Sequence, residues 1–199
     1  MLLTLHGRTI LIKRLEEDDI PKLLIFCDKC KDIGLENNKD FVAIKLVEMV
    51  MPYGQFFIAI DVKSDIIFSL AGVHYLPEIG PNAWRCLFRG AQLPGYVPKW
   101  SMNIFESGIH FTYFLYEQIK FIQSIDDHAE FYISTNVDNK KAGSSSRLNK
   151  TMMPRLANLG YIDLYKENFE LYYTLQNVWK INIDNYFKSR AEYADVIAS

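Results

Sequence analysis

One histidine and one glutamate lie where they could carry acid–base chemistry. His74 falls inside an apolar, β-rich run, and Glu78 follows it in a loop. An imidazole titrates near neutral pH, so His74 could take a proton from a protonated amine, and Glu78 is the alternative base. The competing interpretation of His74 is a half-buried strand histidine with a structural role.

The cysteines and histidines give little support for metal or redox chemistry. Cys27 and Cys30 have the two-residue spacing of zinc and redox motifs, but the chain has no second such pair. The histidines are His6, His74, His110 and His128, and no two have the spacing of metal ligands on one helix face. We therefore expect no metal site and interpret the cysteine pair as small helix residues, one of them buried.

Motifs for nucleophilic catalysis and nucleotide binding are absent from the sequence. It contains no Gly-x-Ser-x-Gly elbow, no P-loop and no dinucleotide fingerprint, and Ser134 lacks the sequence context of a catalytic triad. The serines at 144–146 with Arg147 could hold phosphate oxygens or form a solvated polar loop.

Composition sets the broad class. The 199 residues are 49% hydrophobic and 23% charged, which is typical of one globular domain, here residues 1–199. A net charge of -2 argues against sequence-independent binding to nucleic acid. No apolar run reaches the ~18 residues of a transmembrane helix, and the N-terminal apolar stretch is too short for a signal peptide. We expect no membrane association and a cytoplasmic location.

The elements that must position these residues follow from hydrophobic periodicity. Strands are predicted at residues 9–14, 56–60, 66–76, 84–93, 131–135, 161–165 and 178–183. One helix is predicted with Pro21 in its first turn, and others at residues 40–51, at 101–125 and within 140–159. The three central strands, joined by short turns, predict an antiparallel meander.

The longest helix determines the topology. Residues 101–125 connect two strands by a crossover, which predicts that those strands are parallel neighbours. Pro154 predicts that the following helix is kinked or begins late, and Gly160 is a natural left-handed helix cap. The chain is therefore predicted to be α/β, with a mixed (α+β) sheet.

This order of elements resembles the GNAT N-acyltransferase superfamily over nearly the whole chain. Residues 14–24, an arginine at a strand end followed by acids and an amphipathic helix, look like the family's opening. Residues 136–142 resemble the exit of its fifth strand, where an Asn and an Ala open the next helix. Leu159-Gly160-Tyr161 stands where the family closes that helix, and residues 178–181 resemble its final strand.

The resemblance implies an acyl-coenzyme A site at the loop before the long helix. The family's pyrophosphate motif there is Gln/Arg-x-x-Gly-x-Gly/Ala; Gln92 and Gly95 match its first half, and Val97 replaces its second small residue. A helix N-terminus with a lysine and a hydroxyl suits phosphate, and a proline-stiffened cap that binds nothing is the alternative. The residues expected to contact the cofactor are Gln92, Leu93, Gly95, Lys99, Trp100 and Ser101, flanked by Asn136 and Asn139.

The same resemblance implies the reaction. The family transfers an acyl group from acetyl-coenzyme A, or another acyl-coenzyme A, to an amine. His74 would be the base, and the family's helix asparagine is Asn149 or Asn139. Leu156 stands where the family often has a tyrosine acid, and leucine cannot transfer a proton.

Three hypotheses follow. The first is an N-acyltransferase acting on a small-molecule amine. The second is a non-catalytic GNAT-like binding or assembly module, favoured by Val97 and Leu156. The third is an unrelated α+β domain with the same element order. The C-terminal aromatics, Tyr172, Tyr173, Trp179, Tyr186 and Phe187, suit core packing, a substrate pocket or a homodimer contact.

Overall fold

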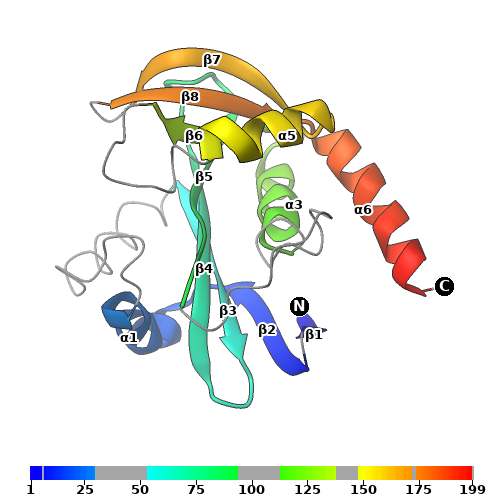
Figure 1. Ribbon diagram of the computed structural model, residues 1–199. Helices are drawn as coiled ribbons and strands as arrows, with labels where there is room; N and C mark the ends of the chain where they lie inside the picture. Colours follow the sequence, from blue (N-terminus) through cyan, green and yellow to red (C-terminus); the bar gives the residue numbers. More distant parts are fainter. Residues whose placement is uncertain (6, 30–52, 94–112, 138–147, 172–173, 199) are drawn as a thin grey trace. The chain divides into compact units, whose positions relative to one another are not determined.

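The computed structural model describes residues 1–5, 7–29, 53–93, 113–137, 148–171 and 174–198, in two compact units (Figure 1). Unit 1 comprises Met1–Tyr75 and Leu87–Ile125, and unit 2 comprises Leu76–Cys86 and Asp126–Ser199. The strands form an eight-stranded mixed sheet in the order β1-β2-β3-β4-β5-β6-β8-β7, in which β5 (Ala83–Gln92) contributes to both units. The predicted α/β class with a mixed sheet is confirmed.

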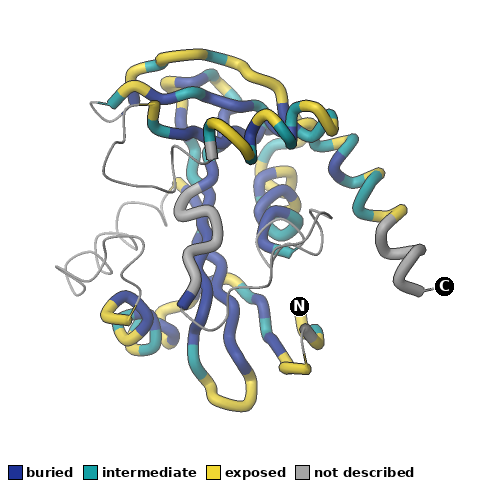
Figure 2. Tube along the Cα trace, viewed as in Figure 1, coloured by how far each residue is buried: buried dark blue, intermediate teal, exposed yellow. Residues whose placement is uncertain are grey.

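Unit 1 is built on antiparallel strands. They are β1 (Leu2–Leu5), β2 (Arg8–Arg14), β3 (Gly54–Asp61) and β4 (Ile66–Tyr75). Figure 2 shows β3 and β4 buried along most of their length, as the predicted meander requires. Strand β1 was not predicted, because a short edge strand with an exposed Leu2 lacks the alternation of a half-buried strand.

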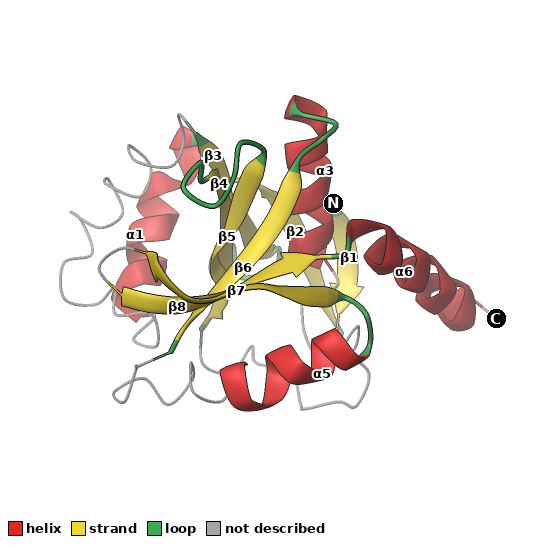
Figure 3. Cartoon of the chain, turned by 90° about the horizontal axis from the view of Figure 1, so that it is seen from above, coloured by secondary structure: helices red, strands yellow, loops and turns green. Residues whose placement is uncertain are grey.

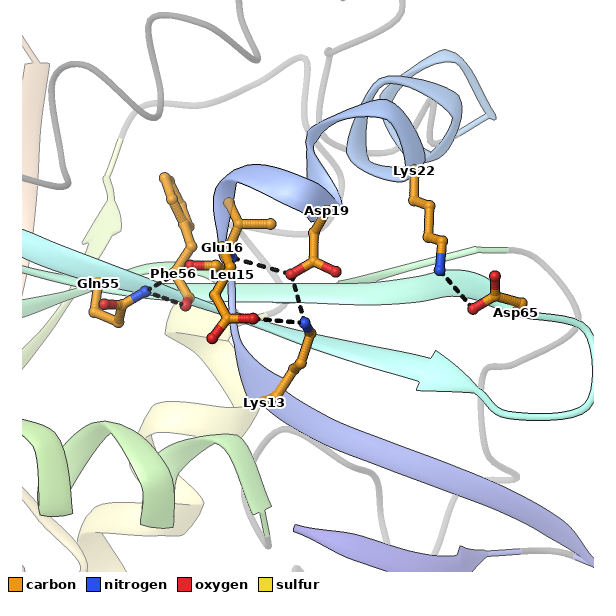
Figure 4. A network of polar contacts seen from close by, with 8 residues as sticks. All are labelled: Lys13, Leu15, Glu16, Asp19, Lys22, Gln55, Phe56 and Asp65. Carbon is orange, nitrogen blue, oxygen red and sulfur yellow. Dashed lines mark hydrogen bonds and ion pairs between the residues drawn. The ribbon is translucent and has the colours of Figure 1, made fainter.

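A polar network joins β2 to the helix α1 (Ile20–Lys29) through a turn of 3-10 helix at Glu17–Asp19 (Figure 4). The Glu16 N–H donates to Asp19 Oδ2 at 3.0 Å, and Lys13 Nζ lies 2.9 Å from the same oxygen. The hydrogen bond to Asp19 raises the pKa of Lys13. The buried Asp19 carboxylate is thus paired, as burial of a charge requires. The acids predicted at the N-terminus of this helix form the 3-10 turn that directly precedes α1.

Three further contacts drawn in Figure 4 involve β3 and the turn that follows it. Gln55 Nε2 donates to the Phe56 carbonyl at 2.9 Å and to the Leu15 carbonyl at 3.3 Å. Lys22 Nζ pairs with Asp65 Oδ1 at 2.6 Å on the surface.

The described part of the long helix is α3 (Leu115–Ile125), and it confirms the prediction over these residues. Its buried stripe contains Ile119 and Ile122, and Gln118 is fully buried. The Gln118 amide donates to the Gly72 carbonyl at 2.8 Å, which ties α3 to β4. Residues 101–112 of the predicted helix, and the whole helix predicted at 40–51, lie outside the described residues.

Unit 2 continues the sheet with β6 (Glu130–Asn136), β7 (Ile162–Leu171) and β8 (Thr174–Ile181), which Figure 3 shows from above. Strands β5 and β6 are parallel, as the crossover predicted, and β8 lies between β6 and β7 with antiparallel pairing to both. Strand β7 runs beyond the predicted residue 165. Residues 166–171 were missed because four of the six are polar and only Leu171 among them is buried.

The described part of unit 2 also contains three helical segments. A π-helical turn, η4 (Leu148–Met152), leads into α5 (Met153–Asn158), so the helix begins late, with Pro154 at its N-terminus as predicted. Gly160 has a φ of 75°, which confirms the predicted cap. Helix α6 (Ile183–Ala198) was not predicted. Within the described ranges, no helix is long and apolar enough to cross a membrane.

Candidate functional site

The carboxyl end of β6 changes abruptly from apolar to polar. Phe131, Tyr132 and Ile133 are followed by Ser134 and Thr135, which are 5% and 1% exposed, and by the half-buried Asn136. Successive side chains of a strand point to opposite faces. Ser134 and Thr135 therefore belong to two different polar clusters within unit 2.

The first cluster orients Asn149, one of the predicted site residues. Trp179 Nε1 on β8 donates to Thr135 Oγ1 at 3.1 Å. The Thr135 hydroxyl donates to Asn149 Oδ1, and Asn149 Nδ2 donates to the Asn136 carbonyl at 2.8 Å. Two predicted site residues, Asn136 and Asn149, are thus hydrogen-bonded to each other.

Local structure explains this cluster. Thr135 pairs with Asn177 in the β6–β8 ladder, so Trp179, two residues further along β8, is its diagonal neighbour on the same face. The turn η4, which carries Asn149, packs against β6. Side chains from three elements therefore meet at one buried hydroxyl.

The second cluster holds an arginine. Arg85 Nε on β5 donates to Ser134 Oγ at 2.7 Å, and its Nη2 lies 3.5 Å from Gln176 Oε1. Gln176, 7% exposed, donates in turn to Thr174 Oγ1 at 3.0 Å. A guanidinium remains charged at any physiological pH, so this cluster places a permanent positive charge on β5.

The ladder between β5 and β6 is short. It joins Ala83, Trp84 and Arg85 to Glu130, Phe131 and Tyr132. In the registers of the described strands, the last four residues of β6 pair with β8.

Glu130, at the start of β6, forms an ion pair with Lys180 and a hydrogen bond with Tyr132. The Tyr132 hydroxyl donates to Glu130 Oε2 at 2.6 Å, and Lys180 Nζ binds Glu130 Oε1. The bonds from Lys180 and Tyr132 lower the pKa of Glu130. Burial, and then the Glu130 carboxylate, raise the pKa of Tyr132. The phenol of Tyr132 therefore keeps its proton at neutral pH.

The other predicted site residues that the structure describes belong to other segments of the chain. His74 is half-buried near the end of β4 in unit 1, in register with Gly54. Leu93, also in unit 1, is buried, and its N–H donates to the Phe68 carbonyl at 2.8 Å. Gln92 is the last residue of β5, and Glu78 is exposed in a turn of unit 2.

Much of the predicted cofactor loop lies outside the described residues. This is so for Gly95, Lys99, Trp100, Ser101 and Asn139, and for the serines at 144–146 with Arg147. Leu156, which the resemblance places where the family often has a tyrosine acid, is described and is 4% exposed. Its side chain packs in the core and offers no proton.

Sequence reasoning did not assign Thr135 or Arg85 to the site, and it named Trp179 only among the C-terminal aromatics. The signal for Thr135 was the Ser-Thr-Asn triplet that ends an otherwise apolar strand. Trp179 and Arg85 carried no such signal, because their partners come from strands far apart in sequence. Cys27 is buried in α1, and no group of three or more potential metal ligands occurs among the described residues.

No protein-family model matches the sequence, and no curated protein matches it. Solved structures do match, at low identity. A spermidine N-acetyltransferase from Vibrio cholerae, in complex with CoA and spermine, aligns with a TM-score of 0.54 and 10% identity, covering 89% of this chain and 98% of that one. A ribosomal-protein-S5-alanine acetyltransferase from Vibrio fischeri gives 0.54 and 9%, covering 92% and 98%.

A GNAT-family acetyltransferase from Staphylococcus aureus aligns similarly, with a TM-score of 0.53, 13% identity and coverage of 86% and 98%. These likenesses extend over nearly the whole chain. The protein therefore has the fold of the GNAT acetyltransferases, and the predicted fold family is confirmed. At identities of 9–13%, the likeness defines the fold and leaves the activity to be argued from the site.

Proposed function

We propose that the protein is an acyl-coenzyme A-dependent N-acyltransferase that acts on a small-molecule amine. The observation that carries this proposal is the Asn149 amide, held in one orientation at the carboxyl end of β6 within a GNAT fold. Acetyl-coenzyme A is the cofactor we propose, with longer acyl chains as alternatives.

The residues at the end of β6 fit the chemistry of coenzyme A, whose arm is a chain of amide groups. A side-chain amide has two N–H donors, and Asn149 gives one of them to the Asn136 carbonyl. The other can serve a ligand carbonyl. In the arrangement that the resemblance to the GNAT family implies, the cofactor's amide chain would lie beside β6 like an added strand. When bound, the cofactor supplies the acyl group as a reactive thioester.

We assign the remaining roles to the residues that the sequence analysis predicted for the site. Lys99 and Ser101 would bind the phosphates at the start of the long helix, with Gln92, Leu93, Gly95 and Trp100 along the loop. Asn136 and Asn139 would flank the cofactor. His74 would take the proton of the attacking ammonium, with Glu78 as the alternative base. Positioning of the two reactants would supply most of the rate enhancement.

The acceptor class also has support. Two of the similar structures are named for amine acetylation, of spermidine in one and of an alanine of a ribosomal protein in the other. A net charge of -2 suits a small cationic amine better than a nucleic acid. We propose a small amine in the cytoplasm as the acceptor.

Release of thiol from acetyl-coenzyme A tests the proposal. The purified protein is incubated with acetyl-coenzyme A and a panel of amines that includes spermidine and an alanine-ended peptide. We expect amine-dependent thiol release that falls at least tenfold in Asn149→Ala, because a hydrogen bond in a water-poor site is worth about 1.4 kcal/mol or more. Asn158→Ala, at an exposed position of α5, is the matched control and keeps activity.

Lys99→Ala tests the phosphate end of the predicted site. Loss of one charge near a pyrophosphate is expected to raise the dissociation constant of coenzyme A several-fold, more at low salt than at high salt. Lys63→Ala, an exposed lysine in the turn after β3, is the control. Equal affinity of the Lys99 variant and wild type would remove this residue from the site.

A non-catalytic GNAT-like module is the second candidate, and Leu156 favours it. The side chain at the position of the family's acid is buried and aliphatic. On this reading the protein binds coenzyme A without turnover, or binds none. Binding measured beside thiol release separates the two candidates.

A further inference from the structure

We infer that Thr135 and Trp179 are positioning residues, which hold the Asn149 side-chain amide in the orientation that a ligand at the end of β6 meets. This inference rests on the proposed function for its ligand, coenzyme A. The relay of hydrogen bonds itself stands on the geometry of unit 2.

The relay runs in one direction through a single hydroxyl. The Trp179 indole can only donate, and it donates to Thr135 Oγ1 at 3.1 Å. Because the Thr135 hydroxyl oxygen accepts this bond through one lone pair, its proton points to another acceptor, Asn149 Oδ1. The Asn177 carbonyl, 3.4 Å from the same hydroxyl, is the longer and weaker alternative acceptor.

The relay determines which way the amide faces. Asn149 Oδ1 accepts from Thr135, so Nδ2 faces the Asn136 carbonyl and donates to it at 2.8 Å. The flipped amide would set Oδ1 against that carbonyl oxygen, and two acceptors repel each other. Three hydrogen bonds therefore agree on one orientation, and the second Nδ2 hydrogen acquires a defined direction.

Burial makes the relay effective. Thr135 is 1% exposed and Trp179 is 7% exposed, so water competes poorly for either group. A hydrogen bond in such surroundings is electrostatically stronger than in water, and a lost partner leaves a buried polar group unsatisfied. A donor held in advance also binds a ligand without the cost of ordering it.

The test compares hydroxyl removal with its rescue. Thr135→Val removes the hydroxyl and keeps the shape, Thr135→Ser restores the hydroxyl, and Trp179→Phe removes the indole donor. Thr151→Val, an exposed position in η4, is the matched control. Thermal unfolding establishes that each variant is folded, and Trp179→Phe tests the same relay if Thr135→Val does not fold.

Two readouts are taken on each variant. The first is the dissociation constant for coenzyme A, measured by calorimetry. The second is the set of side-chain resonances in ¹H–¹⁵N spectra, namely the Asn149 amide pair and the Trp179 indole, with the Trp84 indole as reference. If Thr135 only filled space, its substitution by valine would leave the Asn149 amide resonances in place, and Thr135→Ser would have no shift to reverse.

The inference predicts that Thr135→Val shifts both the Asn149 and Trp179 resonances and weakens coenzyme A binding about tenfold, the effect of about 1.4 kcal/mol. Trp179→Phe should shift the Asn149 pair as well. Thr135→Ser and the Thr151 control should behave as wild type. An unmoved Asn149 pair, or unchanged affinity in Thr135→Val, would overturn the inference.

Failure of the proposed function gives a different pattern. If the wild-type protein does not bind coenzyme A, the proposed function fails, and the resonances alone decide the relay. If Thr135→Val then shifts both the Asn149 and the Trp179 resonances, the relay is supported as a device that orients the amide. If the Asn149 pair does not move, the relay is overturned.

Discussion

Gly160 ends α5 in a backbone conformation that other residues rarely adopt. Its φ is 75°, and a Cβ built there would lie 3.0 Å from Asn185 Nδ2. That amide donates to the Gly160 carbonyl at 2.7 Å and so ties the start of α6 to the end of α5. Gly160 therefore caps α5, and its carbonyl accepts the hydrogen bond that links α5 to α6.

Gly160→Ala should destabilise the protein by about 1–2 kcal/mol, the cost of a left-handed L-residue. The measurement is urea unfolding at equilibrium. Gly80→Ala is the control, because its φ is outside the left-handed region and the nearest heavy atom to its Cβ is 4.0 Å away. Equal losses in the two variants would contradict the role given to Gly160.

Single residues also show what the sequence could predict of the site. Asn136 and Asn149 were proposed from the resemblance alone, and the structure joins them by a hydrogen bond. The contact between Thr135 and Trp179, which completes that cluster, could not be predicted. Their relation depends on the register of β6 against β8, and register is set by long-range pairing rather than by local pattern.

Strand β6 begins with an ion pair whose effect on stability depends on pH. Lys180 and then Tyr132 lower the pKa of Glu130 below its ordinary 4.5. A carboxyl group with a depressed native pKa stabilises the fold above its unfolded pKa, and this contribution is lost as the pH falls through the native value. The loss should therefore occur below about pH 4.5.

Glu130→Gln tests this element. Its midpoint of urea unfolding should lie below that of wild type at pH 7, and the difference should shrink as the pH falls below about 4.5. Glu167→Gln, an exposed glutamate on β7, is the control and should follow the wild-type curve. A constant difference at every pH would mean that the ionic contact with Lys180 contributes nothing.

Helix α6 has one fully buried anchor among its described side chains near its start. Tyr186 is 0% exposed, whereas Lys188 is exposed. Tyr186→Ala should cost about 3 kcal/mol or more, in the range of large-to-small aromatic substitutions in cores. Lys188→Ala should stay within about 0.5 kcal/mol of wild type. A similar small effect of both variants would show that α6 docks through other residues.

The elements with strong periodicity were the ones that sequence could predict. Buried β3 and β4 and the buried stripe of α3 repeat apolar residues at strand and helix spacing. The two elements that were missed, β1 and α6, have mixed surfaces: β1 is an exposed edge, and α6 carries charges between its apolar residues. Tertiary contacts, rather than local pattern, define both.

At the scale of the whole chain, element order carried more information than any motif. The crossover from β5 through α3 to β6 predicted a parallel pair, and that pair is present. The pyrophosphate motif is met only in its first half, yet the fold is that of the GNAT acetyltransferases at 9–13% identity. The structure has two compact units, and the single domain expected over residues 1–199 stays a prediction.

Thermal unfolding with and without excess acetyl-coenzyme A tests the central claim most directly. At ~100 times its dissociation constant, a ligand that binds only the folded state adds about 2.7 kcal/mol. For a chain of this size the melting temperature should rise by about 5–10 °C, and by less in Asn149→Ala at the same ligand concentration. An unchanged melting temperature with both acetyl- and longer acyl-coenzyme A would contradict the proposed acyltransferase.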